Sequence, residues 1–247
     1  MEKAVRAISH LVSRISNRID YSVQKAMASQ ISRAVRREHL TYCSFRKLAR
    51  LERCVELTLE REVPGAVVEF GVALGGSAIV LTKRCRDRHF HGFDLFGMIP
   101  EPSSEKDDIV SRERYKTIAS GQADGIDGAT YYGYRTNLFD EVVEAFARHG
   151  CPVDGRRVFL HKGLFHETWE KFPADRLISV AHIDCDWYEP VTFCLNAALP
   201  RLAKGSMLIL DDYEDYGGAR AAVDEFLLMH KNRFTVDLGE NVVLVHR

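Results

Sequence analysis

Two pairs of acidic residues stand at the ends of two apolar segments, where they are well placed to do chemistry. Asp184 and Asp186 follow one segment, Asp211 and Asp212 follow the other, and each segment has the length of a buried strand. Carboxylates gathered where strands leave a core repel one another unless a cation lies among them. Because oxygen ligands suit a hard divalent ion, the pattern predicts a Mg²⁺ site. The alternative is that these acids cap helices or form solvated strand ends.

A glycine-rich loop follows a third apolar segment and opens a helix. Gly71 and Gly75 lie in this loop, which runs to Ser77, and Glu69 precedes it in the strand. Glycines let a backbone approach a ligand closely and adopt positive φ. Asp94 ends the next strand, where a carboxylate commonly binds ribose hydroxyls, although a plain turn residue is the alternative. The five residues are therefore candidates for binding a nucleotide-type cofactor, either a nicotinamide or S-adenosylmethionine.

The acidic residues help to distinguish these two cofactors. Hydride transfer has no need for several carboxylates at the ends of neighbouring strands. Methyl transfer to a poorly acidic hydroxyl must remove a proton, and a bound metal lowers the acidity barrier and orients the acceptor. A nearby carboxylate can then take the proton. The combination favours a methyltransferase over a nicotinamide oxidoreductase.

The composition indicates one α/β domain with a helical appendage. The chain has 247 residues with 46% hydrophobic content, and its formal net charge of -1 does not favour nucleic acid. The charge is uneven, because residues 1–62 carry 13 Lys and Arg against 7 Asp and Glu, whereas the remainder carries 21 against 28. We expect 1–62 to be a helical extension and 63–247 to be the catalytic domain.

Cysteine usage and hydropathy predict a cytoplasmic protein. No CxxC motif or zinc spacing occurs, no signal peptide is recognisable, and no apolar run approaches the length of a membrane span. We therefore expect the cysteines to be reduced thiols. They are Cys43, Cys54, Cys85, Cys151, Cys185 and Cys194.

The elements of residues 63–247 alternate between strands and helices. Repeated β-α units predict a parallel sheet with right-handed crossovers and helices on both faces, and ligands of such sheets bind outside the carboxyl ends of the strands. A long insertion at about 97–135 interrupts this alternation and is expected to act as a lid. The expected strands are Val67–Val72, Phe90–Phe93, Val158–His161, Ile178–Ile183, Met207–Leu210 and a closing hairpin of Phe234–Leu238 with Val242–Val245. The expected helices begin near Gly76, Asn137, Pro190 and Gly217.

The N-terminal extension is predicted to contain two helices. Residues 1–37 fit an amphipathic helix, broken once, and a second helix spans about Phe45 to Leu59. The first helix could form a lid or a homo-oligomer contact, pack on its own domain, or lie on a membrane surface, and we favour the first of these roles. Its apolar stripe consists of Val5, Ile8, Val12, Ile15 and Ile19.

Five motifs in order resemble the macrocin O-methyltransferase family. The resemblance extends from about residue 40 to the C-terminus. It implies a Rossmann-like class I methyltransferase fold with a seven-stranded, mostly parallel sheet, and S-adenosylmethionine and Mg²⁺ as cofactors. The motifs are Val68-Glu-Phe-Gly-Val-Ala-Leu-Gly-Gly-Ser77, Phe93-Asp-Leu-Phe-Gly97, His161-Lys-Gly-Leu-Phe165, His182-Ile-Asp-Cys-Asp-Trp-Tyr-Glu-Pro190 and Leu210-Asp-Asp-Tyr213.

The same resemblance implies roles for individual residues. Asp184, Asp211 and Asp212 match the metal ligands, and Asp186 matches an acid that serves as the base. Other residues match the cofactor pocket, with the last three near the adenine: Glu69, Gly71, Asp94, Lys162, Gly163 and Phe165.

The expected activity is methylation of a sugar hydroxyl on a natural-product glycoside. Two alternatives stay open at this point. A phenol or catechol acceptor would chelate the same metal through its oxygens, and a non-catalytic partner subunit could bind the cofactor without using it. His182 lies inside a strand, so we expect it to be buried structure rather than a base.

Overall fold

The computed structural model describes residues 20–247, which fold around one seven-stranded sheet with strand order β3-β2-β1-β4-β5-β7-β6. The first five strands in this order are parallel, and β7 is antiparallel to both β5 and β6. This confirms the expected α/β fold with a mostly parallel sheet and a C-terminal hairpin. The strands are β1 Ala66–Phe70, β2 Phe90–Asp94, β3 Val158–Lys162, β4 Ile178–Ile183, β5 Leu202–Leu210, β6 Phe234–Asp237 and β7 Val242–His246.

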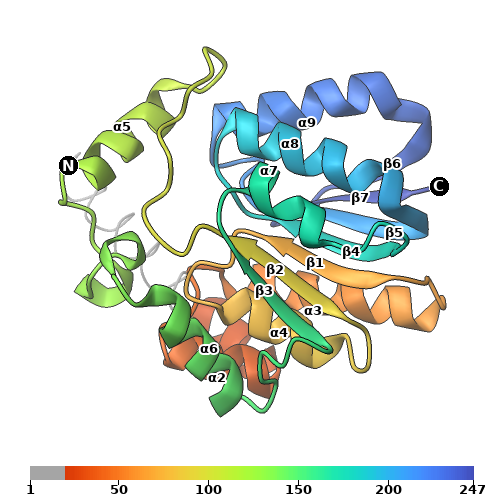
Figure 1. Ribbon diagram of the computed structural model, residues 1–247, viewed down its shortest axis with the longest axis horizontal. Coiled ribbons are helices and arrows are strands. Elements are labelled where there is room, and N and C mark those ends of the chain that lie inside the picture. Colours follow the sequence, from red (N-terminus) through yellow and green to blue (C-terminus); the bar gives the residue numbers. More distant parts are fainter. Residues whose placement is uncertain (1–19) are drawn as a thin grey trace, which may run out of the picture.

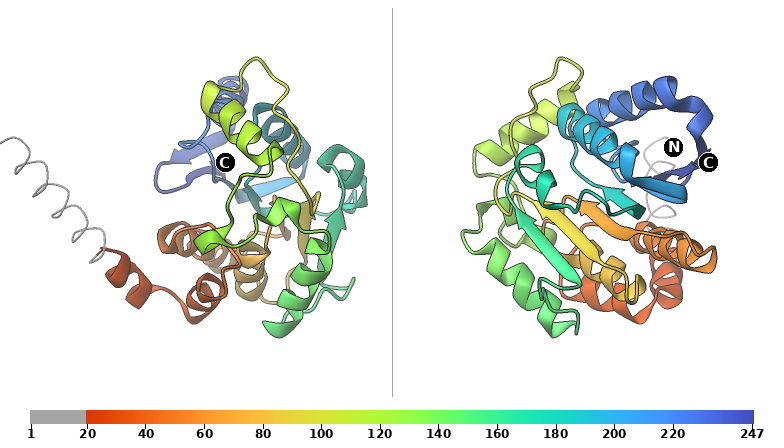
Figure 2. Two further views of the ribbon diagram at one scale, coloured as in Figure 1. Left: turned by 90° about the vertical axis from the view of Figure 1, so that its left-hand side faces the viewer. Right: turned by 45° about the vertical axis from the view of Figure 1, so that its right-hand side comes forward.

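Helices cover both faces of the sheet. In Figure 1, α3 and α4 lie on one side of the strands, and α8 and α9 lie on the other. Both views in Figure 2 show the same separation, with the red and orange helices on one side and the blue helices on the other. The helices are α2 Gln30–Arg37, α3 Phe45–Glu60, α4 Gly76–Arg84, α5 Ile109–Ala119, α6 Leu138–Arg148, α7 Phe165–Thr168, α8 Tyr188–Ala198 and α9 Gly217–His230.

The strands divide the core into two apolar clusters because successive side chains point to opposite faces of a sheet. In β1, Val67 packs in the cluster beneath α3 and α4, whereas the adjacent Val68 packs beneath α8 and α9. All five residues of β1 are buried. A central parallel strand covered on both sides therefore holds Glu69 in the interior, which matters for the site described below.

The N-terminal helices pack on the domain. Residues 20–27 are helical, the chain bends at 28–29, and the Ser29 side chain then caps α2. Val35 of α2 is fully buried, and α3 places Leu48 and Leu51 in the same apolar cluster as Val67. Within the described part, α3 is therefore a layer of the domain, and the boundary at residue 62 stays a prediction. The apolar stripe expected at Val5, Ile8, Val12, Ile15 and Ile19 lies outside the described residues.

The insertion at 97–135 contains α5 and has a small apolar cluster of its own, built on Ile118 and Tyr131. Two aspartates fasten its first part to the main body. Asp107 accepts a hydrogen bond from the Tyr188 backbone N–H at the start of α8 (2.9 Å), and Asp108 accepts one from the Gly217 N–H at the start of α9 (3.0 Å). In Figure 1, α5 stands apart from the sheet.

Some local details differ from the sequence expectations. The helix expected to open at Pro190 begins at Tyr188, so the proline lies inside its first turn, where a missing N–H is tolerated. Asn137 stands at the N-cap of α6, but its side chain makes no capping hydrogen bond. All six cysteines are free and buried. No helix among residues 20–247 has both the length and the apolar character needed to cross a membrane.

Candidate active site

A cavity of about 980 Å³ opens at the carboxyl ends of the parallel strands. Its wall combines the loop after β1, the acidic residues after β4 and β5, and residues of the insertion. This position agrees with the rule that ligands of open α/β sheets bind at the carboxyl edge. Nine predicted site residues line the cavity: Gly71, Ser77, Asp94, Gly163 and Phe165 near the first three strands, and Asp184, Asp186, Asp211 and Asp212 near β4 and β5.

The glycine-rich loop has a backbone that requires glycine. Gly71 has φ of 91° and lies so close to β4 that a Cβ atom would be 1.7 Å from the Asp184 carbonyl oxygen. Gly75, at the N-cap of α4, has φ of 89°. The next residue, Gly76, donates its N–H to the Leu40 carbonyl oxygen (2.8 Å). The loop is thus held between β4 on one side and the segment before α3 on the other.

Asp94 organises the same loop from the end of β2. One carboxylate oxygen accepts the N–H groups of Val72 (2.8 Å) and Ala73 (2.9 Å), and the other accepts the N–H of Phe96. Burial raises the pKa of Asp94, and these backbone hydrogen bonds oppose the rise. The side chain therefore fixes the turn and still lines the cavity. A contact with a ribose stays a prediction for this residue.

Three predicted cofactor residues do not line the cavity. Glu69 is fully buried beneath the loop, and Gly75 faces Val142 of α6. Lys162 is exposed, with its ammonium nitrogen 5.8 Å from the centre of the Phe139 ring. These residues support the cavity wall from behind or stand outside it in this structure, and direct cofactor contacts stay predictions for them.

A buried row of charged groups joins β1, β4 and β5 behind the cavity. His182 Nδ1 lies 2.8 Å from Glu69 Oε1, and its Nε2 lies 3.5 Å from Asp211 Oδ1. Burial alone would lower the pKa of His182, but hydrogen bonds to Asp211 and Glu69 raise it to about 10. These contacts favour the protonated form of His182, which links Glu69 to Asp211. It does not line the cavity, which agrees with the structural role expected for it.

Asp211 is surrounded by donors on both oxygens. Besides His182, Asn241 Nδ2 contacts Oδ1 (2.6 Å), and Lys47 Nζ contacts Oδ2 (2.7 Å). Although burial favours the neutral acid, His182 and Lys47 hold the pKa of Asp211 below its ordinary value. Lys47 comes from the first turn of α3, so the N-terminal helices contribute directly to the site.

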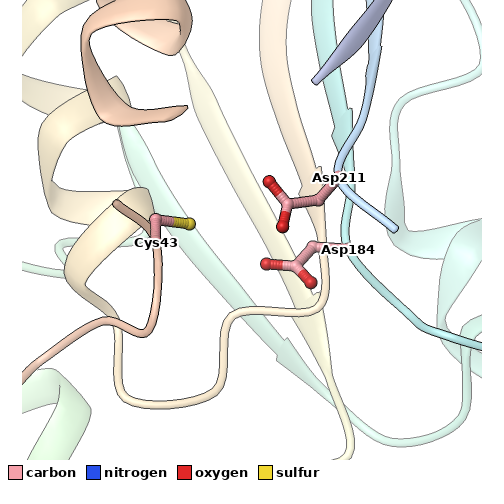
Figure 3. A group of neighbouring side chains, drawn as sticks. All are labelled: Cys43, Asp184 and Asp211. Carbon is pink, nitrogen blue, oxygen red and sulfur yellow. The ribbon is translucent and has the colours of Figure 1, made fainter. Parts of the chain in front are cut away.

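Asp184 and Asp212 lack such cationic partners. Asp212 Oδ2 accepts one backbone N–H, from Asp186 (2.9 Å), and within the described residues no hydrogen bond reaches the Asp184 carboxylate. Burial and the neighbouring aspartates raise the pKa values of both groups well above their ordinary value. Figure 3 shows the carboxylates of Asp184 and Asp211 facing the Cys43 thiol. One carboxylate oxygen from each aspartate and the Cys43 sulfur lie within 4.8 Å of one another.

Asp186 stands at a strained turn beside the other acids. Its φ of 60° lies in the left-handed region, which is unusual for a non-glycine residue and occurs often at functional sites. Burial raises its pKa to about 7, while the charge of Arg114 on α5 opposes the rise. Arg114 lines the cavity, with its guanidinium 5.6 Å from the Tyr131 ring centre. A carboxylate with this pKa can accept a proton near neutral pH.

Four residues of the site were not found by sequence reasoning. Lys47 lies on α3 and Arg114 on α5, and neither residue stands beside a predicted motif. Cys43 and Asp215 are also in the wall, the latter within the same turn as the second acidic pair. Proximity to a motif could have found Asp215, whereas nothing in the sequence links residues near position 45 to those near position 211.

Comparison with known proteins gives this site a family. The family description "Macrocin-O-methyltransferase (TylF)" matches residues 9–240. The chain is 33% identical over 178 residues to the 8-demethyl-8-(2,3-dimethoxy-alpha-L-rhamnosyl)-tetracenomycin-C 4'-O-methyltransferase of Streptomyces olivaceus, an alignment covering 70% of this chain and 62% of that protein. It is 30% identical over 198 residues to the mycinamicin III 3''-O-methyltransferase of Micromonospora griseorubida, covering 77% of this chain and 71% of that protein.

A solved structure supports the fold. The O-methyltransferase NovP superposes with a TM-score of 0.68 at 24% sequence identity, covering 83% of this chain and 81% of that chain. The likeness confirms the expected Rossmann-like architecture. With the family match over most of the sequence, it leads to one conclusion: the chain belongs to the macrocin-O-methyltransferase family, a family of enzymes that methylate oxygen atoms.

Proposed function

We propose that this chain transfers the methyl group of S-adenosylmethionine to a hydroxyl on a sugar of a natural-product glycoside. The observation that carries the proposal is a single cavity whose wall contains both the glycine-rich loop and the Asp186 carboxylate. The names of the relatives support the substrate class, because one acts on a rhamnosyl tetracenomycin and another on mycinamicin III.

We assign the cofactor and the acceptor to different parts of the cavity wall. The loop from Gly71 to Ser77, closed by Asp94, resembles the nucleotide-binding turn of Rossmann-like folds, so we assign S-adenosylmethionine to it. Phe165 offers an apolar ring on the same side. The acceptor then lies toward the insertion, where Tyr131 and Arg114 complete the wall. This arrangement brings the acceptor hydroxyl between the cofactor and the acidic residues.

Asp186 is the proton acceptor in this proposal. A sugar hydroxyl is a weak acid, so its oxygen gains nucleophilicity only as its proton leaves. Asp186 suits this role because it lines the cavity and burial raises its pKa to about 7. The hydrogen bond from its N–H to Asp212 Oδ2 fixes the turn that presents the side chain.

The acids at the ends of β4 and β5 offer ligands for a Mg²⁺ ion, because Asp211 lies close to Asp184 in one group of potential ligands and close to Asp212 in another. Asp184, Asp211 and Asp212 supply oxygen ligands only, which is what a hard cation prefers. Burial and the neighbouring carboxylates raise the pKa values of Asp184 and Asp212, and this crowding supports a bound cation. A bound Mg²⁺ would supply a Lewis acid that lowers the pKa of the acceptor hydroxyl. We therefore propose these three aspartates as the metal ligands.

A methylation assay tests the proposed function. Purified protein is incubated with S-adenosylmethionine, Mg²⁺ and three sets of acceptors: neutral glycosides of deoxysugars, nucleotide sugars and catechols. Mass spectrometry should detect one added methyl group on the sugar of a glycoside. Methylation confined to catechols would reject the sugar acceptor, and the absence of product from every acceptor together with no S-adenosylmethionine binding by calorimetry would reject the activity.

The metal role has a separate test. Exhaustive treatment with EDTA should abolish turnover, and added Mg²⁺ should restore it. Cofactor binding, measured by calorimetry in EDTA, should persist because the glycine-rich loop and Asp94 do not depend on the acidic residues. Full activity in EDTA would reject the Mg²⁺ requirement while leaving methyl transfer intact.

A further inference from the structure

Lys47 is a cation built into the proposed metal site. Its ammonium nitrogen lies 2.7 Å from Asp211 Oδ2, 3.1 Å from the Asp211 backbone oxygen and 3.1 Å from Asp215 Oδ2. The Lys47 side chain is only 18% exposed. Oxygens of two aspartates and one backbone carbonyl thus surround the ammonium. A long side chain from α3 thus places its charge at the end of β5.

Among the three proposed metal ligands, the Lys47 ammonium contacts Asp211. Both oxygens of Asp211 already accept hydrogen bonds or ion pairs, from Asn241 and His182 at Oδ1 and from Lys47 at Oδ2. Asn241, just before β7, and His182, in β4, are buried, whereas Lys47 has a long side chain with several rotatable bonds and lines the cavity. A cation that uses Asp211 as a ligand must therefore compete with the Lys47 ammonium.

The structure also contains a second anion for Lys47. Asp215 stands on the turn after β5 with a side chain that is 56% exposed, and it already touches the ammonium. One carboxylate oxygen from each of Asp211, Asp212 and Asp215 can be chosen so that all three lie within 4.8 Å of one another. A small rotation of the lysine would therefore keep one ion pair while it gives up the other.

We propose that Lys47 is a tethered counter-ion that exchanges with the divalent cation at Asp211. In the metal-free protein the ammonium neutralises Asp211, and when Mg²⁺ binds, the ammonium is released from Asp211 and stays paired with Asp215. The inference rests on the proposed metal role of Asp211. Its consequence is that the lysine sets the affinity of the site for metal, because every binding event must break the Lys47–Asp211 ion pair.

Calorimetric titration of the full-length protein with MgCl₂ alone tests the exchange. Lys47→Met keeps the length of the side chain and removes the charge, so it should bind Mg²⁺ about tenfold more tightly, or ~1.4 kcal/mol. Its metal-free form should melt at a lower temperature than wild type because Asp211 loses a partner. Lys47→Arg, which keeps the charge, should bind Mg²⁺ with an affinity close to that of wild type.

A matched control separates this contact from general charge effects. Arg46→Met removes one positive charge from the neighbouring position of α3, where the guanidinium pairs with Asp20 and Glu240 instead of the acids after β5. Its Mg²⁺ affinity should equal that of wild type. If Arg46→Met and Lys47→Met strengthen binding equally, the effect comes from net charge and the proposed exchange is wrong.

Asp215→Asn tests the second position of the lysine. In the wild-type background it should weaken Mg²⁺ binding, because the displaced ammonium has no carboxylate to pair with. In the Lys47→Met background the same change should have no effect. Equal weakening in both backgrounds would make Asp215 a direct ligand and overturn the exchange. Unchanged Mg²⁺ affinity in Lys47→Met would do so as well, and since no acceptor is used, these results are independent of whether the methylation assay succeeds.

Discussion

The carboxyl ends of β1 and β2 and those of β4 and β5 form two halves of one cavity with opposite physical character. At the first half, Asp94 accepts two N–H groups of the glycine-rich loop on one oxygen and the Phe96 N–H on the other. At the second half, Asp184 and Asp212 are crowded by like charges, which with burial raise their pKa values. The polar groups of the first half are paired with one another in the folded protein. The second half holds crowded carboxylates that a bound cation would stabilise.

The difference teaches how binding and chemistry are divided in this fold. A loop whose conformation is fixed by its own hydrogen bonds can receive a cofactor with little reorganisation. Repelling carboxylates are costly for the folded state, and such cost is common at functional sites. Substitutions should therefore act differently in the two halves, and the following predictions use that contrast, in order of expected effect.

Asp186→Asn should have the largest effect on activity. The amide cannot accept the proton, so turnover should fall roughly 10²–10⁴-fold, the usual share of a general base. S-adenosylmethionine and Mg²⁺ affinities, measured by calorimetry, should stay at wild-type values, because the backbone N–H that contacts Asp212 is retained. A variant with wild-type turnover would remove Asp186 as the base.

Gly71→Ala should push the glycine-rich loop away from the backbone of Asp184, where the two halves of the cavity meet. The new Cβ would meet the Asp184 carbonyl oxygen, at a position with φ of 91°. We expect a loss of ~2–4 kcal/mol in the free energy of unfolding, as strain and overpacking add. Urea denaturation measures it. Gly97→Ala is the control, since its Cβ would meet nothing within 4 Å, and comparable losses in both variants would contradict the argument.

Asp212→Asn should stabilise the metal-free protein. The pKa of Asp212 is raised on folding, so this group lowers stability most above its raised pKa, and the loss shrinks as pH falls from there toward the unfolded pKa. The neutral amide avoids this cost and still accepts the Asp186 N–H. The melting temperature in EDTA should rise by about 2–4 °C for each kcal/mol gained.

Asp211→Asn is the matched opposite of that variant. The pKa of Asp211 is lowered because His182 and Lys47 favour its ionised form, so its charge adds stability above its unfolded pKa. Neutralising it should lower the melting temperature in EDTA. If both substitutions shift the temperature in the same direction, the electrostatic contrast among the acids is wrong.

Arg114→Met should have the smallest effect on turnover, and it should change the pH dependence of turnover. Turnover should fall below about pH 7 in the wild type, because protonated Asp186 cannot act as a base. The positive charge of Arg114 lowers the pKa of Asp186, so its removal should move this acidic limb to higher pH. A pH profile of kcat measures the shift. If the acidic limb stays at the same pH in the variant, Arg114 does not influence the pKa of the base.

Much of the fold followed from local patterns. The β-α alternation predicted the parallel strands and their helical layers, and the two C-terminal segments predicted the hairpin. These predictions succeeded because the periodicity of apolar residues in a strand or a helix is visible within a short stretch of sequence. Boundaries moved by a few residues, as at β5, which begins at Leu202 rather than Met207. The packing of α3 on the sheet was not predicted, since an amphipathic helix shows that it covers something without showing what.

The sequence by itself determined which acids and glycines stand at strand ends, and parallel topology then required Asp184 and Asp211 to approach one another. Only the tertiary structure decided what surrounds them. Glu69 became a buried partner of His182, Lys162 turned outward, and Lys47 reached Asp211 across 164 positions of the chain. The physical reason is that strand periodicity acts over a few residues, whereas charge pairing in a cavity depends on which distant side chains the packed layers bring within a few ångströms.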